Sequence, residues 1–349
     1  MLGISLEMRS YIIRRLLLLI PVLFGIIILT FSILQFFSPV QRASLFVTNP
    51  RQFRDINAII QKYHLSDPVY VQFYYWIREV LHGNLGWSQS VSLPVKDAII
   101  YFLPATLELF IFAVPLIIFI GIRLGRISAV HRDKPVDHFT RGLAIAGYSL
   151  PTFWLGLMLL MVFYGFFSGL FPPGRLGTAA DAFVNSAAFT RYTRINSLDA
   201  ILNLKPWILV DALRHLILPV ITLTVVNIAF VMRIMRSSML ESLGKGYVVA
   251  ARAKGLDEKT VINKHAGRTA LIPVITVAGY LVSGLMAGAV ITETVFTYKG
   301  LGWWSVSAAI QLDIPAVLGF TLFIGTVVVI TNLVVDLLYA YVDPRIRLG

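Results

Sequence analysis

Residues 245–276 read KGYVVAARAKGLDEKTVINKHAGRTALIPVIT, which is the most basic stretch of a very apolar chain. The alanine-rich segment Ala250–Ala253 favours a helix, and Gly255 suits the left-handed residue that often ends one. Asp257 can cap a second helix that leads into the next apolar run. The stretch therefore predicts a short helix, a glycine break and a second short helix between two membrane spans.

The alanines also give this stretch a possible binding role. They leave a flat helix surface that a groove on another protein can approach closely. The alternative is an ordinary basic loop, because positive residues collect on the inner side of a membrane protein.

The composition identifies the class of protein. Of the 349 residues, 57% are hydrophobic and only 14% are charged, and the mean hydropathy is +0.77. A soluble domain carries about 25% charged residues. The chain is therefore a polytopic membrane protein, in contact with the lipid bilayer.

Charge and cysteine content exclude several kinds of site. The net charge is +12, but the basic residues flank apolar runs, so membrane topology explains them and no nucleic acid partner is expected. There is no cysteine, which excludes disulfides and thiolate chemistry. The six histidines are scattered, without an i,i+4 pair, so no metal site is predicted.

Six apolar runs are candidates for membrane-spanning helices, each near the roughly 20 residues that a span needs. The first follows a short basic segment without a signal-peptide cleavage site, so an uncleaved span is expected. The fourth run is shorter than the others. The runs are Leu16–Phe37, Leu103–Ile122, Leu143–Leu170, Leu216–Met232, Leu271–Val295 and Val317–Val342.

Two long polar intervals separate these runs. Ser38–Phe102 holds two amphipathic stretches, one with Phe53, Ile56, Ile59 and Ile60 on a face, the other with Val69, Phe73, Trp76, Ile77 and Val80. They can pack on their own protein, on the membrane surface or on a partner. Phe171–Arg214 is expected to be a second external excursion with short helices.

The distribution of Lys and Arg sets the orientation. With the N-terminus inside, the short inner segments hold 18 of these residues and the outer side holds 12, mostly in two long loops. Both termini are therefore predicted to be cytoplasmic. We expect residues 1–102 to form an N-terminal helix with an external region, and residues 103–349 to form a five-helix core with a cytoplasmic coupling loop at about 236–270.

The segment Tyr247–Asp257 resembles the cytoplasmic coupling loop, or EAA loop, of ABC importer permeases. The likeness is to the B-type membrane subunit of dipeptide and oligopeptide permeases, in which A-R-A-K-G-L is followed by H-A-x-R-x-A-L-x-P. Here these motifs are Ala251–Leu256 and His265–Pro273. Val249 stands where the wider family has the glutamate that names the loop, a glutamate that the peptide branch commonly lacks.

The resemblance covers almost the whole chain. Lys299 stands where the family more often has proline. The other matching segments are Gly83–Ser88, Leu103–Leu109, Ser149–Phe153, Phe296, Gly300–Gly302 and Asn332–Arg347, which ends in D-P-R-I-R.

The resemblance implies a type I ABC importer permease fold with six transmembrane helices. It also implies four kinds of partner or cargo: a second homologous permease, two cytoplasmic ATPase subunits, an external substrate-binding protein, and dipeptides or oligopeptides as cargo, with oligosaccharides or metal complexes as alternatives. The residues that it assigns to ATPase coupling are Tyr247, Val248, Ala250, Ala251, Arg252, Ala253, Lys254, Gly255 and Leu256.

Enzymatic chemistry is not expected in this chain. It has no G-x-x-x-x-G-K-[ST] phosphate loop, so ATP and Mg²⁺ would be handled by partner subunits. We predict no catalytic residue, no cofactor site and no metal ligand. The residues that line the substrate path are not assigned.

Two other classes of protein compete with this interpretation. An ion-coupled secondary transporter would use the carboxylates Glu108, Glu293 and Asp336. Their structural alternatives are a first-turn position after Pro104 for Glu108, and span ends within reach of water or a basic neighbour for the other two. A membrane scaffold without transport activity is the third possibility.

Overall fold

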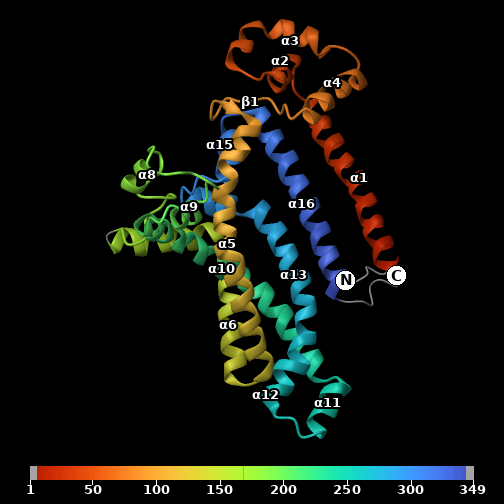
Figure 1. Cartoon of the computed structure of the whole chain (residues 1–349), viewed down its shortest axis with the longest axis vertical. Coiled ribbons are helices and arrows are strands. Elements are labelled where there is room, and N and C mark those ends of the chain that lie inside the picture. The colour runs from red at the N-terminus through yellow and green to blue at the C-terminus, as the bar shows by residue number, and fades with distance from the viewer. Residues whose placement is uncertain (1–5, 168, 343–349) are drawn as a thin grey trace.

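The apolar runs form long helices in the computed structural model, which describes residues 6–167 and 169–342 (Figure 1). Five helices in this part of the chain are long and apolar enough to cross a membrane, and a bent pair makes six if it counts as one span. The all-helical class is confirmed; the strands among the described residues are β1 (Trp87–Ser88) and β2 (Leu93–Pro94), which pair as a short hairpin. The five helices are α1 (Leu6–Leu34), α5 (Val95–Val130), α10 (Pro206–Leu243), α13 (Gly267–Gly288) and α16 (Ile314–Val342).

Two of these helices extend far beyond the apolar runs that predicted them. α10 has 38 residues, although its apolar run Leu216–Met232 was the shortest of the six. α5 has 36 residues and begins at Val95, before Leu103. Hydropathy identifies only the apolar middle of each helix, whereas the backbone hydrogen bonds continue through polar flanks. Pro206 suits the first turn of α10, where its missing N–H is not needed.

The predicted span Leu143–Leu170 is broken. It consists of α6 (Pro135–Ser149), then α7 (Thr152–Leu160) with the π-helical turn η3 (Met161–Phe166), bent by 94°. Leu150 is extended at the break, with φ −77° and ψ 128°. The following residue, Pro151, disfavours helical backbone at the residue before it. The bend is thus a local consequence of the Leu150–Pro151 pair.

Residues 39–81 form a helical cap at one end of the molecule (Figure 1). Its elements are α2 (Pro39–Ala43), η1 (Ser44–Phe46), η2 (Pro50–Asp55), α3 (Ile56–Lys62) and α4 (Val69–Leu81). Ile59 and Trp76 are buried in one apolar cluster with Phe31 of α1 and Leu318 of α16. The amphipathic stretches therefore pack on their own protein, except that Val69 is 55% exposed.

The second excursion contains the expected short helices, α8 (Thr178–Val184) and α9 (Asn196–Leu202). Val184, Phe189, Ala200 and Ile208 form a small apolar cluster beneath them. This cluster joins the excursion to the start of α10, and Figure 1 shows the segment projecting sideways from the bundle.

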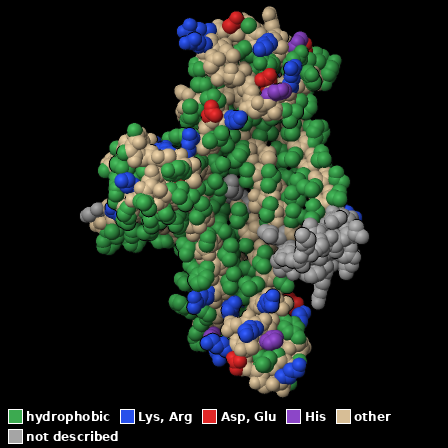
Figure 2. Space-filling model, in the orientation of Figure 1, with side chains coloured by type: hydrophobic (Ala, Val, Ile, Leu, Met, Phe, Trp, Pro, Cys, Tyr) green, Lys and Arg blue, Asp and Glu red, His purple; other side chains and the backbone are tan. Residues whose placement is uncertain are grey.

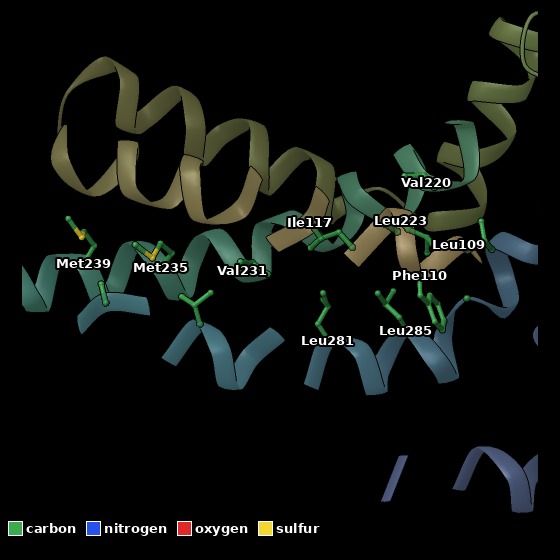
Figure 3. Close-up of a cluster of buried hydrophobic side chains, with 14 of the residues drawn as sticks. Leu109, Phe110, Ile117, Val220, Leu223, Val231, Met235, Met239, Leu281 and Leu285 are labelled. Carbon is green, nitrogen blue, oxygen red and sulfur yellow. The ribbon is translucent and has the colours of Figure 1, made fainter. Parts of the chain in front are cut away.

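The main core lies between α5, α10 and α13. Figure 3 shows Ile117, Val231, Met235 and Leu281 within this cluster. α5 and α10 pack closely because Gly125 has no side chain: a Cβ there would lie 2.6 Å from the Met232 carbonyl oxygen. Small residues at such points allow two backbones to approach each other.

Two short helices complete the fold between α13 and α16. They are α14 (Val290–Val295) and α15 (Leu301–Ile310). Trp304 of α15 is fully buried and stacks on Phe102 at 5.7 Å between ring centroids. Its indole fills a core cluster between α5 and α16.

Candidate functional site

The predicted helix, glycine break and second helix lie at the end of the molecule opposite the cap (Figure 1). They are α11 (Gly246–Ala253), α12 (Glu258–Thr260) and the π-helical turn η4 (Val261–Ala266). We call this end the loop end. Gly255 has φ +75°, as the left-handed break requires. The Asp257 carboxylate accepts a hydrogen bond from the Thr260 N–H at 2.9 Å and caps α12.

One face of α11 is packed against its own chain. Val248 is fully buried and Ala251 is 5% exposed. Both belong to the main core cluster, together with Met239 of α10 and Val261 of η4. These two of the nine predicted coupling residues therefore hold α11 on the bundle.

The other seven predicted coupling residues are exposed. The large apolar side chains among them are Tyr247, 42% exposed, and Leu256, 41% exposed; the neighbouring Val249 is 58% exposed. Exposed basic side chains surround them at this end of the molecule, as Figure 2 shows. The result is an apolar ridge with a basic rim, which is a suitable surface for another protein.

Charged groups stiffen the loop after the glycine. Arg252 donates two hydrogen bonds to Glu258, at 2.7 and 3.1 Å, and so joins α11 to α12 across Gly255. Hydrogen bonds from Thr260 hold the pKa of Asp257 below its usual range, so the cap stays ionised at neutral pH. Arg126 of α5 donates to Asn263 of η4 at 2.9 Å. The loop is thus connected to a third helix.

The chain joins this surface directly to two membrane helices. α10 ends at Leu243, and only Gly244 and Lys245 precede α11. η4 continues into α13 at Gly267 without a break. A displacement of α11 as a rigid element would therefore move the ends of α10 and α13 together.

One interpretation of the sequence placed Glu108 in the first turn of a helix. That interpretation is wrong, because α5 begins 13 residues before Glu108. Its buried carboxylate accepts hydrogen bonds from Arg175 (2.8 Å), Tyr298 (2.8 Å) and the Ser197 N–H (2.7 Å). These partners come from two segments far away in the sequence. Glu108 therefore fastens the second excursion and the loop after α14 to α5.

The other two predicted carboxylates differ from each other. Glu293 is fully buried, so the expected access of water is wrong; it accepts hydrogen bonds from Thr106 (2.7 Å) and the Trp303 N–H (2.9 Å). Asp336 does have the expected basic neighbour, Arg15 at 2.8 Å.

Sequence reasoning missed two further polar clusters. At the loop end, the Asp137 carboxylate pairs with Arg236 at 2.7 Å and accepts from Ser128, which joins α6, α10 and α5. Near the cap, Asp313 accepts from Ser88 at 2.7 Å. The sequence shows only that Asp137 and Asp313 are charged; it shows neither their burial nor their partners, which lie 99 and 225 residues away.

Among the described residues, no three His, Cys, Asp or Glu side chains are grouped so that they could hold a metal ion. The polar clusters found here join helices together. What the arrangement can do is mechanical: it can pass a movement from the surface at the loop end to membrane helices.

Residues 121–348 match the family described as binding-protein-dependent transport system inner membrane component. The chain is 41% identical to a probable D,D-dipeptide transport system permease protein of Escherichia coli strain K12, over 95% of each chain. It is 38% identical to the dipeptide transport system permease protein of the same organism, over 97% of this chain and 99% of the relative. An oligopeptide transport system permease protein of Bacillus subtilis strain 168 is 36% identical, over 97% of this chain and all of the relative.

Proposed function

Because the chain belongs to the inner membrane components of binding-protein-dependent transport systems, we propose that its cargo is dipeptides or oligopeptides. It is a permease subunit, and the ATPase of the transporter is a separate polypeptide. The proposal is supported by relatives that are 36–41% identical over nearly the whole chain and are named for peptide transport. Oligosaccharides and metal complexes are the alternatives. The chain itself is a multi-pass inner-membrane protein that works with a binding protein and an ATPase.

We further propose that the exposed face of α11 contacts the ATPase subunit. The observation that carries this step is the placement of α11: its apolar ridge faces outward, while Val248 and Ala251 fasten it to the core. If a groove on the ATPase subunit closed around this ridge, α10 and α13 would move. Their movement would change access to the translocation path. ATP hydrolysis in the partner would thereby drive transport.

The full assembly in this proposal has a second, homologous permease and two ATPase subunits. A broad apolar surface on α6 supports another membrane partner or lipid there, because Phe139 is 70% exposed, Leu143 57% and Tyr148 60%. The translocation path would lie between the two permeases. The loop end and both termini would be cytoplasmic, as the Lys and Arg count predicts; Asp343–Arg347 lies outside the described residues.

Uptake by vesicles that contain the complete transporter tests the proposal. We expect dipeptide uptake that needs internal ATP and survives collapse of the proton and sodium gradients. Glu293→Gln and Asp336→Asn remove the charges that an ion-coupled carrier would need, and each variant should retain some ATP-dependent uptake. Uptake that continues without ATP and stops when an ion gradient is collapsed would contradict the proposal.

A further inference from the structure

A polar cavity of about 370 Å³ lies between the second excursion, α5 and the loop after α14. Its size is within the range of pockets that bind small molecules, about 300–1,000 Å³. Unlike most such pockets, it is lined mainly by polar and charged side chains. Figure 2 shows exposed basic side chains over the segment that contains α8 and α9.

Four basic residues line this cavity: Arg175, Arg191, Arg194 and Lys299. Arg175 is neutralised by Glu108. In the part of the chain that the structure describes, no carboxylate lies within 4.0 Å of the charged nitrogens of the other three. Arg191 donates only to neutral oxygens, those of Asn185 and Val184. Asp181 is the one acidic lining residue among those described, so positive charge is in excess.

The walls of the cavity are held in place from beneath. Glu108 joins Arg175 and the N–H of Ser197 on one side to Tyr298 on the other. The Asp199 carboxylate accepts from the backbone N–H groups of Thr193 and Arg194, at 2.9 and 2.8 Å. The backbone beneath the cavity is therefore fixed, and it loses little entropy when the cavity binds a ligand.

These exposed cations have no carboxylate partner among the described residues, so they suit a ligand whose negative group can form charge-assisted hydrogen bonds. A cavity of this volume holds more than the tip of one acidic side chain. We infer that this pocket binds a short peptide through the peptide's free C-terminal carboxylate, held by Arg194 and Lys299. The inference rests on the proposed function, in which short peptides are the cargo.

Chemical labelling of Lys299 in the complete transporter tests the inference. An amine-reactive ester would acetylate the accessible lysines. Mass spectrometry would follow the exposed Lys299, with the half-buried Lys205, outside the pocket, as the internal control. Dialanine should slow the labelling of Lys299 and leave that of Lys205 unchanged. Dialaninamide has the same shape without the carboxylate and should protect neither lysine.

A matched pair of variants sharpens the test. Arg194→Gln should raise the dialanine concentration for half-protection about tenfold, the effect of losing one hydrogen bond to a charged group. Arg132→Gln replaces an exposed arginine far from the pocket and should leave the half-protecting concentration of dialanine unchanged. Unchanged labelling of both lysines without peptide would show that each variant is folded.

Three results would overturn the inference. Dialanine and its amide could protect Lys299 equally, or neither could protect it. Protection of Lys299 only by the peptide-free binding protein would make the pocket a docking site. ATP-dependent uptake of dialanine by the same preparation separates this failure from that of the proposed function. If dialanine is taken up but does not protect Lys299, only the peptide pocket is excluded. If dialanine is not taken up, the proposed cargo is excluded.

Discussion

Arg175 donates a hydrogen bond to the carboxylate of Glu108 at 2.8 Å, across 67 residues of sequence. The Glu108 side chain has no exposed surface, and that of Arg175 is 20% exposed. This ion pair, with Tyr298 and the Ser197 N–H, joins three separate segments. It fixes the second excursion on the membrane bundle, and it is a structural group rather than an ion-binding one.

Glu108→Gln should therefore destabilise the protein. The substitution leaves the Arg175 charge partly buried without its counter-charge, which costs about 3 kcal/mol. Thermal unfolding of the purified chain in detergent should show a clear loss of stability. Glu241→Gln breaks an exposed pair with Lys245 and should change stability by about 0.5 kcal/mol or less. Equal melting temperatures of Glu108→Gln and Glu241→Gln would contradict the structural role of Glu108.

Gly125 should not tolerate a side chain. In Gly125→Ala the new Cβ would lie 2.6 Å from the Met232 carbonyl oxygen and 2.7 Å from Met235 Cβ, which forces α5 away from α10. We expect a destabilisation of about 1–3 kcal/mol. Gly142→Ala, in α6, meets no atom within 4 Å and should stabilise the helix by up to about 1 kcal/mol. Opposite shifts in melting temperature would verify the close packing.

Substitutions at two neighbouring alanines of α11 test its roles in folding and in ATPase coupling separately. Ala251→Glu places a charge in the core and should lower the melting temperature. Ala250→Glu alters only the exposed face, so it should melt like the unchanged protein but lose association with the ATPase subunit. Pull-down and substrate-stimulated ATPase activity would measure the loss. Normal stimulation in Ala250→Glu would exclude this face as the contact.

The orientation can be tested by cysteine labelling, because the chain has no native cysteine. Ser186→Cys, after α8, and Lys254→Cys, after α11, both replace exposed residues. An impermeant maleimide should label the first in intact cells and the second only after permeabilisation. Labelling of Lys254→Cys from outside would reverse the topology.

The sequence alone determined the class of protein, the number of apolar runs and the helix–glycine–helix form of residues 246–266. Each depends on local chemistry: hydropathy over about 20 residues, the left-handed conformation available to Gly255, and the capping carboxylate of Asp257. The motifs from Ala251 to Pro273 also identified the family correctly, because they are read directly from residue order.

Only the tertiary structure decided which side chains meet. The sequence showed that Glu108 is a carboxylate within an apolar run, but Arg175 and Tyr298 reach it through packing between distant segments. The resemblance assigned Ala251 to ATPase coupling, yet its side chain is buried in the core of its own chain. Periodicity reports the faces of one helix; what covers each face depends on how neighbouring helices pack, and that is a property of the whole fold.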